Sequence, residues 1–232
     1  MQTTLIKQHL SCSGEECLKD DFFNINLRNG IVTHASYKGL SIEQNPNIID
    51  VFNTLISNYK PSRILEIGTF HGGLTFIMRD LLDANELHNS DVLTYDVNSP
   101  IFMLHALGDK KITSKTKNLF SDSYLDFNST DTRQELFDFI NQEGRTIVLC
   151  DGGNKKNEFK LISSLLKIGD IIMAHDYSPN NEYFENNVRN KYWNWLEIDD
   201  SDIDLSCVQY NLKPLMVDEF IKVAWVCKIK EN

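Results

Sequence analysis

The chain has 232 residues, which suits one domain of moderate to large size, or one domain with an appendage. Hydrophobic residues make up 41% and charged residues 24%, close to the averages of soluble globular proteins, and this argues against general disorder. The formal net charge of −10 argues against nucleic acid or an anionic membrane as a partner, because both attract basic surfaces. A small or neutral substrate fits this charge better.

No apolar run approaches the roughly 20 residues that cross a bilayer, and the start of the sequence lacks the apolar segment of a signal peptide. We therefore expect a cytosolic (cytoplasmic) protein. The five cysteines form no dense framework, so we expect free thiols rather than a set of disulfides.

The N-terminal part of the chain differs in pattern from the rest. Residues 1–45 are polar and weakly periodic, and we expect them to form an arm or lid ahead of a main domain at 46–232. Apolar residues at helical spacing over 48–59 then predict a helix, which Pro61 ends.

Strands and helices are expected to alternate through the main domain. In chain order we predict a strand over 63–67, a helix over about 72–82, strands over 91–97 and 111–118, a helix over 131–142 with Asp131 as N-cap, a strand over 145–151, a helix over 157–167 and a strand over 170–176. The last two segments, 206–212 and 221–230, both look like strands with no clear helix between them, so we expect an antiparallel pair that closes the sheet. The alternation predicts an open, mostly parallel α/β sheet.

Acidic residues lie at the carboxyl ends of several predicted strands. Glu66, Asp96, Asp151 and Asp176 all take such positions. In an open α/β sheet, ligands bind beyond the carboxyl ends of the strands, near the point where strand order reverses. We expect these carboxylates to gather at that edge.

A glycine-rich turn, RILEIGTFHGGLT, follows the first of these strands. Gly68 allows a sharp turn, and Gly72 and Gly73 let a ligand approach the start of the next helix. The dinucleotide fingerprint requires glycine where Phe70 stands, which makes NAD or FAD a poor fit.

The carboxylates beside this turn suit a different cofactor. Glu66 would repel a pyrophosphate but could pair with an ammonium group, and Asp96 could accept hydrogen bonds from both hydroxyls of a ribose. A ligand with an amino acid at one end and adenosine at the other satisfies both residues. S-adenosylmethionine is such a ligand.

At this point the sequence resembles a known family. ILEIGTFHGG followed by TYDV is similar to the first two motifs of class I S-adenosylmethionine-dependent methyltransferases, and YKGLSIEQNP, VLCDGGNKKNEF and LLKIGDIIMAHDY resemble the cephalosporin hydroxylase and rhamnosyl O-methyltransferase group. The resemblance runs from about Tyr37 to Tyr177. It implies a Rossmann-like class I methyltransferase fold with a mostly parallel seven-stranded sheet and an antiparallel C-terminal strand pair. It also implies methyl transfer to a hydroxyl, with magnesium as the expected cation and manganese or iron as alternatives.

The resemblance also assigns site residues by position. The implied cofactor residues are Glu66, Gly68, Gly72 and Asp96, and the implied metal ligands are Asp151, His175 and Asp176. Since His175 and Asp176 are consecutive, they would point to opposite faces of a regular strand, and both can bind one ion only if the chain already turns there.

The catalytic base is less clear. Relatives often carry DGxH where this chain has DGGN, and the amide of Asn154 cannot take a proton near neutral pH. Lys155 is the nearest substitute, although a lysine that opens a helix is more often solvated. His71 in the glycine loop is the other candidate catalytic residue.

The implied reaction is a single displacement in which a hydroxyl oxygen attacks the sulfonium methyl. A cation favours a small vicinal diol, such as a sugar or natural product, as acceptor. Tyr37 and the aromatic residues of 181–195 could wall in its ring, although packing in the core or in an interface between copies of the chain is the favoured explanation for Trp193 and Trp195. Three alternatives stay open: an iron-dependent oxygenase, a cofactor-binding protein without turnover, and, least favoured, a dehydrogenase.

Overall fold

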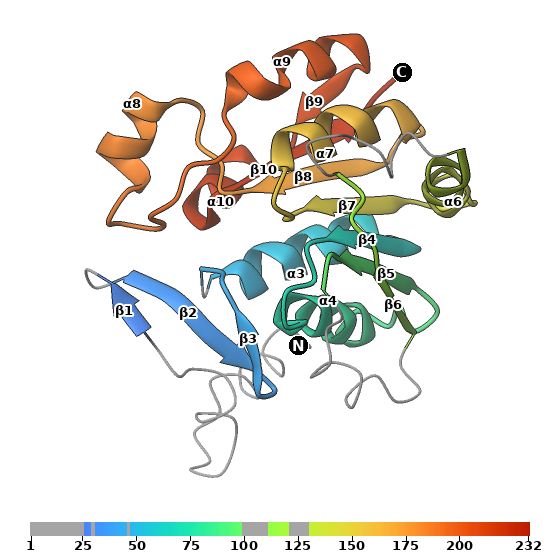
Figure 1. The fold of residues 1–232 in the computed structure, drawn as a ribbon, viewed down its shortest axis with the longest axis horizontal. Helices are drawn as coiled ribbons and strands as arrows, with labels where there is room; N and C mark the ends of the chain where they lie inside the picture. Colours follow the sequence, from blue (N-terminus) through green and yellow to red (C-terminus); the bar gives the residue numbers. More distant parts are fainter. Residues whose placement is uncertain (1–25, 29–30, 46, 99–110, 121–129) are drawn as a thin grey trace.

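The computed structural model describes residues 26–28, 31–45, 47–98, 111–120 and 130–232 (Figure 1). These residues form a small antiparallel sheet near the N-terminus and a larger mixed sheet with helices on both faces. None of the described helices is both long enough and apolar enough to span a membrane.

The larger sheet has seven strands in the order β6-β5-β4-β7-β8-β10-β9. Their bounds are β4 Arg63–Ile67, β5 Asp91–Asp96, β6 Ile112–Thr116, β7 Thr146–Cys150, β8 Ile171–His175, β9 Leu212–Pro214 and β10 Trp225–Lys230. The first five strands in this order pair in parallel, and β10 is antiparallel to both β8 and β9. The predicted fold class is confirmed, and strand order reverses between β4 and β7, where ligand sites are expected.

The described helices lie mostly over the two faces of this sheet, with the short helix Asn181–Tyr183 to one side (Figure 1). They are α3 Ile48–Tyr59, α4 Gly73–Ala84, α6 Thr130–Ile140, α7 Lys155–Ile162, α8 Asn181–Tyr183, α9 Asp200–Gln209 and α10 Val217–Phe220, with 3-10 turns at Ser163–Leu165 and Ile221–Val223 and a π-helical turn at Phe184–Val188. Phe52 of α3 packs with Ile64 in one buried cluster, whereas Phe159 of α7 packs with Leu65 in another. Ile64 and Leu65 are adjacent in β4, so consecutive side chains of this strand fill the two opposite layers of the core.

The described part of the N-terminal segment is more regular than predicted. It forms three antiparallel strands, β1 Asn26–Arg28, β2 Ile31–Tyr37 and β3 Leu40–Ile42, where no strand was expected. The strand β3 runs close to the start of α4, since a Cβ added at Gly73 would lie 2.7 Å from the carbonyl oxygen of Ser41. The division into 1–45 and 46–232 stays a prediction.

The C-terminal third corrects one predicted strand. Most of 206–212 lies in α9, and β9 begins only at Leu212. Asp199 and Asp202 form a capping box that starts α9, and the apolar Leu205 and Val208 point outward, 83% and 84% exposed. The predicted antiparallel pair exists as β9 and β10, but α10 and a 3-10 turn separate the two strands.

Two predicted helix starts also shift. Asp131 is not an N-cap, because α6 begins at Thr130 and Asp131 lies inside its first turn. The helix α7 begins at Lys155, two residues before the predicted start at 157.

Candidate active site

Two cavities open at the carboxyl edge of the sheet, on either side of the turn after β4. The first, of about 250 Å³, lies over β7 and β8, and its lining includes Asp151, His175 and Trp195. The second, of about 400 Å³, lies over β4 and β5, and its lining includes Asp96. Gly68 borders both cavities. The two therefore meet where strand order reverses.

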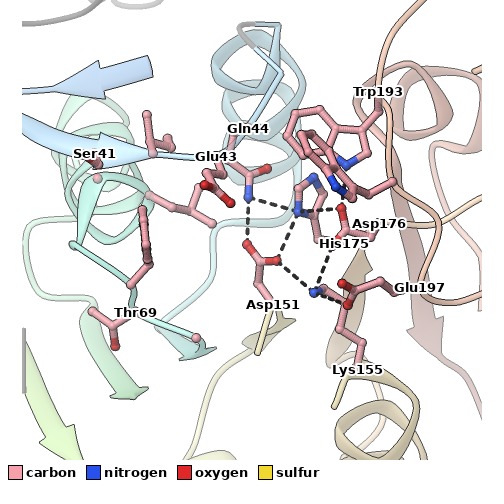
Figure 2. A pocket seen from close by; sticks show the side chains of 16 residues that line it. Ser41, Glu43, Gln44, Thr69, Asp151, Lys155, His175, Asp176, Trp193 and Glu197 are labelled. Carbon is pink, nitrogen blue, oxygen red and sulfur yellow. Dashed lines mark hydrogen bonds and ion pairs between the residues drawn. The ribbon is translucent and has the colours of Figure 1, made fainter. Parts of the chain in front are cut away.

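All three predicted metal ligands gather in the first cavity. One ligand atom from each of Asp151, His175 and Asp176 lies within 4.8 Å of the others. His175 Nδ1 is 3.1 Å from Asp151 Oδ1 and 3.7 Å from Asp176 Oδ1 (Figure 2). The strands β7 and β8 are parallel neighbours, which brings their carboxyl ends together.

The backbone explains how two consecutive residues face one cavity. Asp176 has φ of 55°, in the left-handed region, so the chain turns directly after β8. His175 and Asp176 therefore do not alternate as they would in a continuing strand. Their burial also helps to fix them, since His175 is 2% and Asp176 8% exposed.

Aromatic rings enclose His175. Its ring stacks on Trp225, with centroids 4.9 Å apart, and tilts against Trp193 at the same distance. Burial favours the neutral imidazole, but the charges of Asp176 and Asp151 outweigh it and raise the pKa of His175. The buried Nε2 has no hydrogen-bond partner among the described residues, so Nδ1 is the nitrogen that takes part in the polar cluster.

Gln44, in the loop between β3 and α3, completes this cluster, although the sequence indicated no role for it. Its Nε2 donates to Asp151 Oδ2 at 2.7 Å and lies 3.3 Å from His175 Nδ1, while its Oε1 accepts from Trp225 Nε1 at 2.9 Å. Two anchors thus hold the amide against the carboxylate. Gln44 connects the N-terminal segment to the site.

Lys155 lies inside the site rather than in solvent. Its side chain is 7% exposed, and Nζ is 2.9 Å from Asp176 Oδ2, 2.8 Å from Glu197 Oε2 and 3.8 Å from Asp151 Oδ1. Burial would lower the pKa of Lys155, but Asp151, Asp176 and Glu197 outweigh burial and raise it. A lysine held in its charged form is a poor general base, so the structure disfavours the predicted role of Lys155 as the base.

The predicted aromatic wall is only partly present. Trp193 is 2% exposed and donates to Asp176 Oδ1 at 2.5 Å, so it packs within the core as favoured from the sequence, although it also contributes to the lining of the first cavity. Trp195 is 38% exposed and lines the first cavity. Tyr37 does not line it: this residue is 4% exposed and donates to Asp80 of α4, so the prediction that Tyr37 walls in an acceptor is wrong.

Asp96 lies in the second cavity and shapes the glycine turn. Its Oδ2 accepts from the Phe70 backbone N–H at 2.7 Å, and its Oδ1 accepts from that of Asn98 at 2.9 Å. Asn154 also lines this cavity and not the first. Carboxylate oxygens can accept further hydrogen bonds, so the position of Asp96 suits contact with ligand hydroxyls.

Glu66 is more deeply buried than expected for a ligand contact. It is fully buried and lines neither cavity, and its Oε2 accepts from the hydroxyls of Thr75 and Thr94, each at 2.5 Å. Its Oε1 has no partner among the described residues. Burial raises the pKa of Glu66 to about 8, although the two hydroxyls oppose the rise. A cofactor role for Glu66 therefore stays a prediction.

The other predicted residues of the turn have structural positions. Gly72 has φ of 88° and precedes α4 as its N-cap. The His71 ring stacks on Phe70, with centroids 4.1 Å apart. Neither Gly72 nor His71 is among the residues that line the two cavities, and their predicted roles stay predictions.

The buried Glu66 predicts a pH-dependent stability. Since its pKa is raised in the folded state, the folded protein holds this proton between about pH 4.5 and 8, whereas the unfolded chain releases it. The contribution of Glu66 to the free energy of unfolding should therefore fall as pH rises through this window, by up to about 1.4 kcal/mol per pH unit. We expect a flatter profile in Glu66→Gln, measured by urea unfolding from pH 5 to 8.5. Parallel profiles in the two proteins would contradict the prediction.

Comparison with known proteins shows which family this chain resembles. The family model described as "Rhamnosyl O-methyltransferase/CmcI" matches residues 29–195. Among solved structures, a CmcI apo structure matches with a TM-score of 0.60 at 16% identity, covering 84% of this chain and 76% of the other. A CmcI structure with SAH matches with a TM-score of 0.58 at 13% identity, covering 90% of this chain and 88% of the other. A CmcI structure with Mg and SAM matches with a TM-score of 0.52 at 15% identity, covering 83% of this chain and 75% of the other. At these identities the likeness shows the fold. No curated protein sequence matches significantly.

Proposed function

The chain belongs to the rhamnosyl O-methyltransferase/CmcI family of S-adenosylmethionine-dependent methyltransferases, and from this premise we propose that it methylates a hydroxyl group of a small molecule with the help of a divalent cation. One observation carries the proposal. The cavity with the carboxylate and histidine cluster meets the cavity lined by Asp96 at Gly68. A donor in the second cavity can therefore present its methyl group to an acceptor in the first.

The second cavity suits the nucleoside part of the donor. Its volume of about 400 Å³ is that of a small-ligand pocket, and Asp96 offers two carboxylate oxygens near its edge. The CmcI structure with SAH is of the same fold. We assign Asp96 to the ribose hydroxyls and the turn at Gly68 to the methionine end.

The first cavity fits a divalent cation. Asp151 and Asp176 offer carboxylate oxygens and His175 offers a ring nitrogen, and these ligand atoms all lie within 4.8 Å of one another. One of the solved structures of the same fold is a complex of CmcI with Mg and SAM. When bound, the cation would lower the pKa of an acceptor hydroxyl and could hold two neighbouring hydroxyls in one orientation. Carboxylates favour magnesium, whereas the imidazole is better suited to manganese or iron.

The chain's own residues supply alignment rather than an evident base. Lys155 is held in its charged form, and Asn154 lies in the other cavity. Trp195 and Phe70 line the first cavity with their side chains 38% and 45% exposed, which suits packing against the ring of an acceptor. The acceptor oxygen would attack the methyl carbon as the carbon–sulfur bond breaks, and most of the rate would come from holding the two in line.

Asp96→Ala tests the cofactor assignment. Loss of hydrogen bonds to the ribose should weaken S-adenosylhomocysteine binding by on the order of 1.5–3 kcal/mol, measured by calorimetry. Asp91→Ala is the matched control, because Asp91 lies at the other end of the same strand and should leave the affinity unchanged. Equal affinities in the two variants would remove Asp96 from the cofactor site.

Turnover tests the reaction itself. The protein would be incubated with labelled S-adenosylmethionine, magnesium or manganese, and a panel of sugar and catechol diols with their monohydroxy analogues. Methylation restricted to the diols supports the proposal. Cofactor binding without turnover on any acceptor would favour a protein that has lost catalysis, and oxygen consumption with ferrous iron would favour an oxygenase.

A further inference from the structure

The first cavity contains a fixed positive charge among its carboxylates. Four acidic residues line the cavity, Glu43, Asp151, Asp176 and Glu197, and among its described lining residues Lys155 is the one lysine or arginine. Of the four, Asp151, Asp176 and Glu197 surround the ammonium group of Lys155. The ammonium group lies within 3.8 Å of an oxygen from each of these three carboxylates, and Figure 2 shows it pointing toward them. It also donates to the carbonyl oxygen of Gly152 at 3.0 Å, so all of its three protons have acceptors nearby.

We propose that Lys155 is a resident cation of this site, which holds the carboxylates together in the metal-free protein and lowers the affinity of the site for a divalent cation. The inference rests on the metal site proposed above. It assigns Lys155 a positioning role in place of proton transfer.

The location of Lys155 argues for an electrostatic role. Lys155 is the first residue of α7, where the helix dipole disfavours a positive charge, and it is 7% exposed, where a charge requires partners. Apolar packing of its four-carbon stem would not explain why three carboxylates point toward one ammonium group. The ion pairs with these carboxylates offset both the unfavourable helix dipole and the cost of burying the charge.

The charges leave the site net negative even with Lys155 in place, which suits a divalent cation. The three carboxylates around the ammonium carry, together with it, two net negative charges when His175 is neutral, and Glu43 is a further acidic residue of the cavity lining. The ammonium group pairs with Oδ2 of Asp176, while the other oxygen of this carboxylate, Oδ1, faces His175. It also ties Glu197 to Asp176, so Glu197 is not free to coordinate the ion.

Removing the charge of Lys155 should therefore strengthen metal binding. We expect Lys155→Met and Lys155→Gln to bind Mn²⁺ at least about tenfold more tightly than the wild type, because one nearby like charge is removed and Glu197 is released. Binding would be measured on the full chain by calorimetry at fixed pH, without cofactor or acceptor. Lys155→Arg keeps the charge, and Lys156→Met changes an exposed neighbour that pairs with Asp202. Both controls should stay within about threefold of the wild type.

Thermal unfolding with and without Mn²⁺ covers the case in which a neutral variant is unstable. Variants that fold only when Mn²⁺ is present would support the proposal, because the ion would then replace the missing charge. Variants that remain unfolded at every Mn²⁺ concentration, or that bind Mn²⁺ no more tightly than the wild type, would overturn it. A wild type that binds no Mn²⁺ beside a Lys155→Met that does would instead overturn the metal part of the proposed function and leave the inference standing.

Discussion

Gly68→Ala should destabilise the protein by about 3 kcal/mol or more, and lower the melting temperature by about 6 °C or more. The residue has φ of 94°, which a side chain rarely tolerates, and an added Cβ would lie 2.2 Å from the carbonyl oxygen of Asp151. The contacted atoms belong to the backbone after β7, which is paired with β4 and cannot move aside cheaply. Moving it would also displace Asp151, so metal affinity should fall with stability.

Two neighbouring glycines provide matched controls. A Cβ at Gly153 would meet no heavy atom within 4 Å, so Gly153→Ala should change stability by at most about 1 kcal/mol. A Cβ at Gly152 would meet Glu158 Oε1 at 2.3 Å, the end of a flexible side chain, and an intermediate effect is expected. Thermal unfolding of the three variants would rank their melting temperatures, with Gly68→Ala expected to be the lowest and Gly153→Ala the highest. Equal melting temperatures of Gly68→Ala and Gly153→Ala would contradict the prediction that the ends of β4 and β7 are too closely packed for a side chain at Gly68.

The parallel part of the sheet is predictable from sequence because its strands are buried on both faces. Every residue of β4, β7 and β8 is buried, and each strand is a short, mostly apolar segment ended by a turn. Burial on both faces leaves few alternatives for such runs. The adjacency of the acidic strand ends then follows from the general rule for open α/β sheets, without knowledge of any side-chain contact.

The C-terminal segment shows where local patterns are insufficient. SCVQYNL contains residues with strand preference, yet the capping box at Asp199 and Asp202 starts a helix that continues through Gln209. The apolar residues of α9 do not all mark its buried face, because Ile203 is buried whereas Leu205 and Val208 are exposed. A pattern-based prediction relies on apolar residues facing inward, and two of these three do not.

The neighbours of the site were beyond prediction for a different reason. Gln44 meets Asp151 across 107 positions of sequence, and Glu197 meets Lys155 across 42. Such contacts depend on how separate elements dock, and no local spacing encodes them. Lys155 illustrates the consequence, since its position at a helix start suggests a solvated residue, whereas tertiary contacts bury it among carboxylates.

The turn after β8 is a case in which the sequence was sufficient. Both His175 and Asp176 can reach one ion only if the chain turns between them, and the following YSPN favours a turn. The positive φ of Asp176 confirms that turn. The geometric condition for the predicted metal site is therefore met, while metal binding itself is a prediction to be measured.

Asp151→Asn and Asp176→Asn should each weaken Mn²⁺ and Mg²⁺ binding by about 100-fold and lower methyl transfer accordingly. The substitution keeps the shape of the side chain and removes its charge, so loss of binding would report loss of a ligand rather than loss of packing. Burial raises the pKa of Asp176, but His175 and Lys155 outweigh burial and hold that pKa below its usual range. Asp176 is thus ionised at neutral pH and ready to bind a cation without releasing a proton.

Asp96→Ala gives the opposite pattern and serves as the control. It removes a carboxylate from the other cavity, so it should weaken S-adenosylhomocysteine binding and leave metal affinity unchanged, whereas the two Asn variants should do the reverse. His175→Ala separates the metals: if Nδ1 is a ligand, the variant should lose more affinity for Mn²⁺ than for Mg²⁺, because the softer ion gains more from imidazole. Full metal affinity in both Asn variants would show that the cluster of Asp151, His175 and Asp176 is held together by its own hydrogen bonds and ion pairs, and that methyl transfer proceeds without a metal at these residues.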